Sequence, residues 1–543
     1  MRSIEIPQPE DRGFKYRLLE ILPLTLTLLI LLLPVILGKI SPRLAAYFLV
    51  AYLLLWFIRA VGLDIRSLQG WRTMKQHMGL PWQKMLVDLE NLQPTLKTAP
   101  AWHARNIQRV GRNIPHTRIK PTEVYHAVMI AFWNESRDVL EPTVESVLAT
   151  AFDHKKIILI LAYEQRGGQE IQDTAEYLIK KYGHNFYHAE AVMHPWPMTG
   201  EVIGKGGNVT YAGRRLQEYL EEEKIDPLNV LVTTLDSDNR PDKQYFGALT
   251  YTYCSTEEPK YASYQPVTMY LNNIWDAPAP MRVIATGNSF WNVVLSLRQH
   301  LLRNFSAHAQ PMAALIDTDF WSVRTIVEDG HQYWRTWFRY DSKYDVYPIF
   351  VPIYQDAVLT DNYRRTLKMQ FVQVRRWAWG ASDIAYFANQ AFFKPNNIPL
   401  HKRISKFLRL MEGHLSWSTA PLILLLAAYP LFFFHTSSAP PIGFLANELP
   451  QTASGLQRIA MVGIIISLFL SMRSLPPKPE RYKRHRTVWM VIQWVYLPIT
   501  SIIYSSFAAI YAQYRLATGR YLGFIVTEKA TKSERVDVSS MLK

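Results

Sequence analysis

The sequence predicts an α/β domain with a parallel sheet, inserted between N-terminal and C-terminal transmembrane helices. Two observations favour this class. Long apolar runs gather at the two ends of the 543-residue chain, while the middle alternates short apolar runs with helical patterns. A chain of this length also exceeds one compact core, so we expect several structural units.

The apolar runs at the ends have the length of membrane-crossing helices. A bilayer needs about 20 residues of helix, and residues 21–37 and 44–58 qualify once their flanks are counted. No small-residue cleavage site follows the first run, and the second run comes at once, so we expect a transmembrane hairpin and not a signal peptide. Further apolar runs near the C-terminus cover residues 415–434, 459–472 and 488–512. Pro498 lies inside the last run and predicts a break or a re-entrant helix.

Basic residues set the expected orientation, because cytoplasmic loops of membrane proteins are enriched in Lys and Arg. Residues 435–455 contain neither and should face outward, whereas residues 473–486 are strongly basic and should face the cytoplasm. The formal charge of +15 is concentrated beside the apolar runs, without a basic-aromatic nucleic-acid motif, so it indicates a membrane surface as partner and not nucleic acid. We therefore expect a multi-pass protein of the cell membrane with its middle domain in the cytoplasm; the number of spans stays open.

These patterns divide the chain into six predicted parts. In chain order they are a transmembrane hairpin (1–62), an interfacial linker (63–117), the α/β domain (118–393), an interfacial helix (394–414), transmembrane or re-entrant helices (415–513) and a cytoplasmic tail (514–543).

The middle domain begins with alternating strands and helices. Apolar runs predict strands at residues 124–132, 156–162 and 229–235, and helices at residues 139–152 and 171–182. This order predicts a parallel sheet with helices on both faces. Ligands of such sheets bind at the carboxyl ends of strands, which is where Asn134, Glu135, Glu164 and Asp236 fall.

Asp236 and Asp238 directly follow the third predicted strand. Two carboxylates one residue apart can hold a hard divalent cation through oxygen ligands. Such a cation can bridge a diphosphate and stabilise charge on a leaving group. The alternative is a polar turn with solvated carboxylates.

Two later groups of residues also have chemical potential. Asp329, beside Glu328, has the carboxylate that a general base needs, although an acidic pair also caps helices. Gln373, Arg376 and Trp377 fall on one predicted helix, where Arg can clamp a diphosphate and Trp can stack on a sugar. The alternative for this group is an amphipathic helix with an interfacial Trp.

Taken in order, these elements resemble the processive family 2 glycosyltransferases, which include the cellulose, hyaluronan and related β-polysaccharide synthases. The Asn-Glu, Asp-x-Asp, Glu-Asp and Gln-x-x-Arg-Trp elements have the family's order, and the resemblance covers the middle domain and the apolar segments on both sides. It implies a GT-A fold, an inverting mechanism and a requirement for Mg²⁺ or Mn²⁺. It also implies a nucleotide-diphosphate sugar as donor, with a UDP-sugar favoured over a GDP-sugar, and a glycan or lipid as acceptor.

The resemblance also implies roles for single residues. The catalytic pair would be Glu328 and Asp329, with Asp329 as the base. Asp236 and Asp238 match the carboxylates for metal and diphosphate, and Lys205 in Gly204-Lys-Gly-Gly-Asn looks like the family's Lys-Ala-Gly-Asn segment near the nucleotide. The implied donor-binding residues are Asn134, Glu135, Glu164, Lys205, Asp236 and Asp238. Gln373, Arg376 and Trp377 match the motif that holds the diphosphate and the acceptor end of the glycan.

Some features depart from the family. The second strand ends in Glu164 where the family has Asp-Asp or Asp-Ser, residues 526–529 read Val-Thr-Glu-Lys in place of Val-Thr-Pro-Lys, and a Phe-Phe-Cys-Gly segment has no clear equivalent. A cellulose-synthase identity is therefore in doubt. From their position, residues 316–321 are expected to shape the acceptor site.

Other functions remain open at this stage. A transferase that adds one sugar to a lipid carrier and stops would share these residues. An Asp-nucleophile phosphatase would use Asp236 as nucleophile and Asp238 as acid, but Asn239-Arg240-Pro241 stands where such enzymes have Thr or Val. A non-catalytic scaffold is disfavoured because every carboxylate that the transfer needs is present.

Overall fold

An eight-stranded mixed sheet forms the centre of the molecule, in the order β3-β2-β1-β4-β7-β6-β8-β5. The computed structural model describes residues 3–113, 118–426, 455, 463, 465–483 and 485–525. The strands are β1 Tyr125–Phe132, β2 Ile157–Glu164, β3 His188–His194, β4 Val230–Asp236, β5 Arg240–Pro241, β6 Ala262–Met269, β7 His308–Pro311 and β8 Asp345–Tyr354.

The parallel half of the sheet agrees with the sequence. β1 pairs in parallel with β2 and with β4, and Ala131 at the end of β1 lies opposite Asp236. The prediction of an entirely parallel sheet is wrong, because β7 runs antiparallel to both β4 and β6. Two reversals restore the direction, so β6 and β8, which pair in parallel, run the same way as β4. The carboxyl ends of five strands therefore lie along one edge of the sheet; these strands are β1, β2, β4, β6 and β8.

Helices cover both faces of the sheet, as predicted. Along β1, Ala127 and Met129 pack against α7 (Lys205–Glu222) and α10 (Met312–Asp317). Val128 and Ile130 face the opposite layer, which contains α5 (Arg137–Leu148), α6 (Gly168–Tyr182), α8 (Tyr245–Cys254), α3 (Trp82–Asn91) and α4 (Ala101–Asn113). Strands buried on both faces are apolar throughout, which is why they were visible in the sequence.

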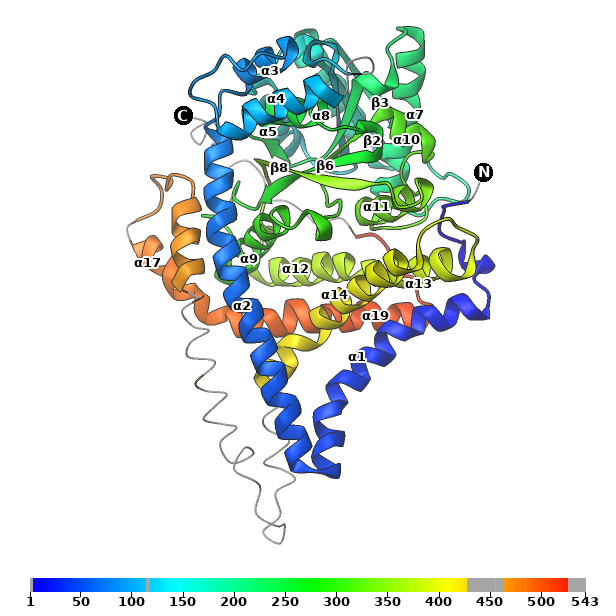
Figure 1. The fold of residues 1–543 in the computed structure, drawn as a ribbon, viewed down its shortest axis with the longest axis vertical. Helices are drawn as coiled ribbons and strands as arrows, with labels where there is room; N and C mark the ends of the chain where they lie inside the picture. Colours follow the sequence, from blue (N-terminus) through cyan, green and yellow to red (C-terminus); the bar gives the residue numbers. More distant parts are fainter. Residues whose placement is uncertain are drawn as a thin grey trace.

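Among the described residues, three helical stretches are long and apolar enough to cross a membrane: Phe14–Ile40, Arg43–Met78 and His485–Ala517. The first predicted pair lies on α1 (Phe14–Ile40) and α2 (Pro42–Met78), which meet at Ser41 below the sheet (Figure 1). α2 continues well beyond its apolar run and reaches β8. The end of α2 together with α3 and α4 thus occupies the predicted linker at residues 63–117.

The predicted interfacial helix is continuous with the next apolar run, because α14 covers Leu400–Leu426. Within residues 459–472, helix is described from Ile465 and continues to Ser474. Several predicted segments fall wholly or partly outside the described residues; these are 427–434, most of 435–464, the Val-Thr-Glu-Lys segment at 526–529 and the rest of the tail.

Pro498 does not break the helical path of the last apolar run, so the predicted break is wrong, while the alternative of a re-entrant helix stays a prediction. The stretch comprises α17 (His485–Ile492), a 3₁₀ segment (Gln493–Tyr496), α18 (Leu497–Thr500), a π segment (Ser501–Phe507) and α19 (Ala508–Ala517). Pro498 lies in the first turn of α18, where its missing N–H costs little. The changes of helical pitch absorb the proline while the helical path continues.

Four further helices lie between the sheet and α19: α9 (Ala279–Ser296), α11 (Glu328–Arg339), α12 (Tyr363–Ala378) and α13 (Ser382–Ala388) (Figure 1). They form a layer between the sheet and the apolar hairpin.

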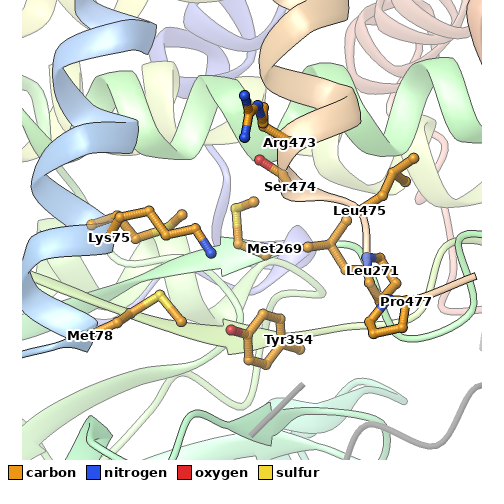
Figure 2. Close-up of a pocket in the computed structure, with 11 residues that line it drawn as sticks. Lys75, Met78, Met269, Leu271, Tyr354, Arg473, Ser474, Leu475 and Pro477 are labelled. Atoms are coloured by element: carbon orange, nitrogen blue, oxygen red, sulfur yellow. The ribbon is translucent and has the colours of Figure 1, made fainter. Parts of the chain in front are cut away.

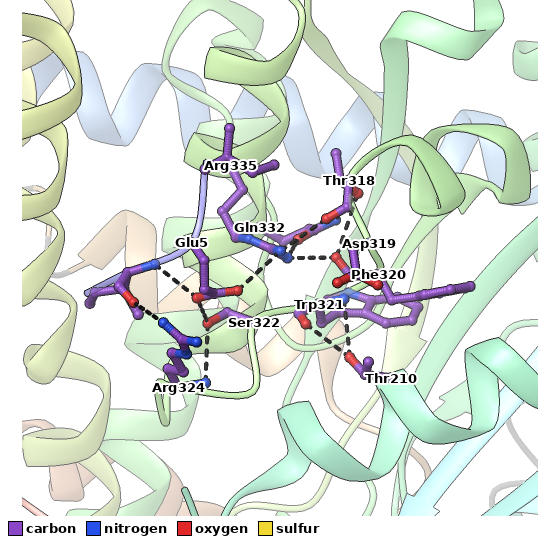
Figure 3. A network of polar contacts seen from close by, with 12 residues as sticks. Glu5, Thr210, Thr318, Asp319, Phe320, Trp321, Ser322, Arg324, Gln332 and Arg335 are labelled. Carbon is purple, nitrogen blue, oxygen red and sulfur yellow. Dashed lines mark hydrogen bonds and ion pairs between the residues drawn. The ribbon is translucent and has the colours of Figure 1, made fainter. Parts of the chain in front are cut away.

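The N-terminal segment before α1 is tied to this layer (Figure 3). Glu5 pairs with Arg335 of α11 at 3.1 Å and accepts a hydrogen bond from the hydroxyl of Ser322. Arg335 also donates to the carbonyl oxygens of Thr318 and Phe320, at 2.9 and 2.6 Å. The segment therefore fixes the loop that leads into α11.

Candidate active site

A cavity of about 150 Å³ opens at the edge where the parallel strands end. It is lined by every predicted site residue except Asn134, namely Glu135, Glu164, Lys205, Asp236, Asp238, Glu328, Asp329, Gln373, Arg376 and Trp377. Asn134 is exposed and lies outside the lining; its backbone N–H donates to Glu135 at 3.2 Å. Residues far apart in the sequence thus converge on one cavity.

The two aspartates sit on a tight turn at the end of β4. The N–H of Asn239 donates to the carbonyl oxygen of Asp236 at 3.0 Å, which turns the chain back so that both carboxylates line the cavity. The two carboxylate oxygens of Asp236 accept from Lys205 Nζ and from Ser306 Oγ, both at 2.6 Å. Asp238 is 6% exposed and accepts from the backbone N–H of Asp356 at 3.2 Å.

Lys205 and Arg376 give the cavity two cationic side chains. Burial disfavours the charge of Lys205, but the carboxylates of Asp236, Glu328 and Asp329 more than offset it, and the net pKa of Lys205 is raised. Lys205 is therefore a charged ammonium at neutral pH. The guanidinium of Arg376 lies 5.0 Å from the ring centroid of Phe524, which also lines the cavity. Two cations beside clustered carboxylates suit a ligand that carries both phosphate and metal.

The acidic pair stands at the first turn of α11. Asp329 accepts two backbone hydrogen bonds, from Ser306 at 2.5 Å and from Gly330 at 2.7 Å. Glu328 is buried, and burial first and then the charge of Asp329 raise its pKa to about 7. The helix N-terminus favours negative charge here, so the pair combines an oriented carboxylate with a buried neighbour that is readily protonated.

The motif on α12 forms the wall opposite the aspartates. Gln373 accepts from Gln370 at 3.2 Å, and the ring of Trp377 lies 6.3 Å from that of Tyr270, tilted by 49°. The predicted helix is present. An indole, a phenol and an amide together offer a flat surface with polar groups, which suits a sugar ring.

The residues at the ends of β1 and β2 are already engaged with the protein. Glu135 accepts from the backbone N–H of Trp133 at 2.9 Å and from the hydroxyl of Ser237 at 3.2 Å. It thereby braces the β1 loop against the Asp-x-Asp turn. Glu164 pairs with Arg166, whose guanidinium lies 4.2 Å from the ring centroid of Trp133.

The lining residues that the sequence interpretation did not name include Tyr270, Ser306, Gln355, Asp356 and Phe524. Tyr270 follows β6, and Gln355 and Asp356 follow β8, so they lie at the carboxyl ends of their strands, as Asp236 does at the end of β4. The rule that ligands meet strand ends would have found them if β6 and β8 had been recognised as parallel to β4.

Residues 316–321, which are expected to shape the acceptor site, do not line this cavity, and their role at the acceptor stays a prediction. No residue of this segment is among its described lining residues. Asp319 pairs with Arg214 at 3.0 Å on the surface, and the backbone of Trp321 is hydrogen-bonded to the hydroxyl of buried Thr210. The segment anchors α7 to the loop before α11.

The donor set has the chemistry of a site for a hard cation. Asp236 and Asp238 supply carboxylate oxygens, and Mg²⁺ is commonly held by one or two carboxylates together with phosphates of a substrate. Among the residues that the structure describes, no group of three or more His, Cys, Asp or Glu side chains is placed to hold a metal. A cation here would take its remaining ligands from a substrate or from water.

No family model and no curated protein matches the sequence. Among solved structures, the fold is similar to the mannosyltransferase PcManGT from Pyrobaculum calidifontis in complex with GDP-Man and Mn²⁺, with a TM-score of 0.36 and 13% identity over 83% of this chain and 97% of that chain. It is also similar to residues 1–349 of S. aureus TarS in complex with UDP-GlcNAc, with a TM-score of 0.34 and 10% identity over 73% of this chain and 93% of that chain. The first neighbour is a mannosyltransferase and the second binds UDP-GlcNAc, but likeness at this level assigns neither a family nor a substrate to this chain.

Proposed function

We propose that this chain is a membrane-bound inverting glycosyltransferase. It transfers a sugar from a nucleotide-diphosphate sugar, with a UDP-sugar favoured, to a growing polysaccharide or a glycolipid acceptor. The observation that carries the proposal is the convergence of the Asp-x-Asp, Glu-Asp and Gln-x-x-Arg-Trp elements on one cavity. These three elements lie far apart in the sequence but line the same cavity.

In the proposed reaction Asp329 is the general base. It takes the proton of the acceptor hydroxyl while the acceptor oxygen forms a bond to the anomeric carbon of the donor and the nucleoside diphosphate leaves. The backbone hydrogen bonds from Ser306 and Gly330 hold its carboxylate in one orientation. Burial raises the pKa of Glu328, beside Asp329, to about 7, so its carboxyl is partly protonated near neutral pH.

Asp236 and Asp238 would hold Mg²⁺ or Mn²⁺, and the cation would neutralise charge on the departing diphosphate. Lys205 and Arg376 supply positive charge from the protein to the same group. Lys205 already bonds to Asp236, so a bound diphosphate or cation would replace that contact.

The three apolar helical stretches support a place at the membrane. With the α/β domain on the cytoplasmic side, the donor would be drawn from the cytoplasm. Product length and the face on which product appears distinguish repeated addition from a single transfer.

The test is nucleotide release by the purified protein in lipid, across UDP-sugars and GDP-sugars with Mg²⁺ or Mn²⁺. We expect one donor to give metal-dependent release of nucleoside diphosphate. Asp329→Asn should lower kcat by about 10²- to 10⁴-fold, the usual contribution of a general base, while donor binding is retained. Asp238→Asn should weaken the dependence on metal as well as the rate.

Asp319→Asn is the matched control, because this aspartate has 76% of its side chain exposed and lies away from the cavity lining. It should keep full activity. Full activity of Asp329→Asn would remove the proposed base, and release of inorganic phosphate in place of nucleoside diphosphate would favour a phosphatase.

A further inference from the structure

A second cavity, of about 230 Å³, lies beside the ends of β6 and β8 (Figure 2). Its lining comes from the end of α2, from β6 and β8, and from the segment after the helix Ile465–Ser474. The lining includes Met74, Lys75, Met78, Met269, Tyr354 and Arg473.

The chemistry of the second cavity is cationic at its edge and apolar inside. Of its described lining residues, Lys75 and Arg473 are the charged ones, and both are exposed cations. Met74, Met269 and Tyr354 are buried behind them. Methionine side chains adapt to irregular apolar ligands, and Lys and Arg are the usual partners of phosphate.

Tyr354 also faces a carboxylate. Its hydroxyl lies 3.4 Å from Asp242, whose pKa is raised chiefly by burial. Asp242 is not among the lining residues, so the face presented to a ligand carries positive charge.

The two cavities share a wall made of consecutive residues. Met269 and Tyr354 line the second cavity, whereas the next residues, Tyr270 and Gln355, line the active-site cavity. The N–H of Gln355 donates to the carbonyl oxygen of Met269 at 2.8 Å, so the two strand ends move as a unit. A ligand that contacts one face of this wall is therefore in a position to act on the other.

The same strand end reaches the proposed chemistry directly. The amide of Gln355 donates to Ser306 Oγ at 2.9 Å, and Ser306 in turn holds Asp236 and Asp329. The backbone N–H of Asp356 donates to Asp238. The wall thus connects to both the Asp-x-Asp turn and the proposed base.

We propose that the second cavity binds a small water-soluble phosphate ester between Lys75 and Arg473, and that this ligand regulates the active site through the ends of β6 and β8. The regulatory consequence rests on the proposed function, whereas the binding does not. The phosphate contacts the two cations, and the ester group packs against Met74, Met78 and Tyr354.

A phosphate group can also belong to a lipid, but the position of the cavity favours a soluble ligand. Lys75 lies about 26 Å along α2 from Ile58, where the apolar run ends, at 1.5 Å per residue. The headgroup layer on each side of a bilayer is only about 5–8 Å thick. Along α2, a lipid that stays in its leaflet does not reach Lys75, whereas Arg473 directly follows the apolar run at residues 459–472; a test in lipid discs therefore separates the two sources of phosphate.

The test uses phenyl phosphate, which joins a phosphate to a small apolar group, and inorganic phosphate as comparison. Binding to the purified full chain is followed by saturation-transfer NMR on the phenyl protons. We expect saturable binding of phenyl phosphate, which inorganic phosphate displaces only weakly. Lys75→Gln and Arg473→Gln should each weaken this binding at least about tenfold. Arg72→Gln, an exposed cation on the same helix outside the lining, should bind like the wild type.

Hydrogen exchange gives the second readout, and it needs no donor or turnover. Phenyl phosphate should slow exchange of the amides of Ser306, Gln355 and Asp356 several-fold in the wild type and in Arg72→Gln, but not in Lys75→Gln. Binding that both cavity variants retain would overturn the site, and unchanged exchange at these amides would overturn the coupling.

Lipid discs separate the two sources of phosphate. Phenyl phosphate should bind equally well in discs of zwitterionic and of anionic phospholipid. Loss of binding in anionic discs alone would show that a headgroup reaches the cavity and would overturn the soluble ligand. If no nucleotide sugar is turned over, the proposed function fails, while the NMR and exchange results still decide the binding and the coupling.

Discussion

At the scale of single residues, the active-site cavity is organised by Ser306. Its hydroxyl donates to Asp236, its backbone N–H donates to Asp329, and it accepts from the amide of Gln355. One small residue thus connects the Asp-x-Asp turn, the acidic pair and the end of β8. A lone serine before a four-residue strand gives no sequence signal, so the position could not have been found without the topology.

Glu328 gives the molecule a specific dependence of stability on pH. Its pKa rises from 4.5 in the unfolded chain to about 7 in the fold, mainly because it is buried. A raised pKa means that the stabilisation is complete below pH 4.5 and is lost as the pH rises to about 7. The loss for this single group is on the order of 3 kcal/mol.

Glu328→Gln should remove this loss, because the amide stays neutral. We expect the melting temperature of the wild type to fall relative to that of Glu328→Gln between pH 4.5 and 7, measured by differential scanning fluorimetry in detergent. Glu10→Gln, at an exposed position, is the control and should follow the wild type. Parallel profiles of Glu328→Gln and wild type would contradict the raised pKa.

At the scale of elements, the close approach of α7 to the loop before α11 places Lys205 in the cavity. A Cβ on Gly206 would lie 2.2 Å from the carbonyl oxygen of Ser322 and 3.2 Å from the Cβ of Glu328. Only glycine lets the helix start so near to this backbone. The sequence marked this segment through the motif around Lys205, but the reason for its glycine is visible only in the packing.

Gly206→Ala should therefore displace either the start of α7 or the loop. We expect a loss of stability of about 1–3 kcal/mol, the cost of overpacking, and weaker binding of nucleotide because Lys205 moves. Chemical denaturation and nucleotide titration measure the two effects. Gly287→Ala is the matched control, since Gly287 lies on α9 with nothing within 4 Å of its added Cβ. Alanine there should be neutral or stabilising by about 0.5–1 kcal/mol.

The elements also show how far sequence reasoning extends. β1, β2 and β4, with α5, α6 and α12, were predicted because their burial or helical periodicity leaves a pattern in the sequence. β7 has four residues and β5 has two, too few for any periodicity, and their pairing depends on partners far away in the chain. The antiparallel pairing of β7, and with it the direction of β6 and β8, is therefore visible only in the structure.

At the scale of the whole molecule, the N-terminal segment links the apolar hairpin to the proposed catalytic centre. It lies directly before α1 and contacts α11, α13 and the loop at residues 318–324 (Figure 3). Tyr386 donates its hydroxyl to the carbonyl oxygen of Ile4 at 2.6 Å, and Arg324 donates to that of Ile6 at 3.2 Å. The segment thus gives α1 a direct connection to the helix that carries Asp329.

Glu5→Gln tests this connection. The change removes the charge that pairs with Arg335, whose guanidinium is only 3% exposed and keeps its bonds to the backbone at Thr318 and Phe320. We expect a loss of stability of about 1–3 kcal/mol for weakening a partly buried ion pair. A lower kcat with little change in donor affinity should accompany it, because α11 carries the proposed base while most donor contacts lie elsewhere.

A double-mutant cycle with Arg335→Met separates the pair from general damage to the fold. If Glu5 acts through Arg335, the two changes together should cost less than the sum of the single changes, by about 1 kcal/mol or more. Additive costs would place the effect of Glu5 in its hydrogen bond with Ser322. Glu5→Gln with unchanged stability and kcat would show that the segment only rests on the domain, and coupling of the hairpin to the active site would then have to run through its other contacts, such as that of α2 with β8 or that of α1 with α13.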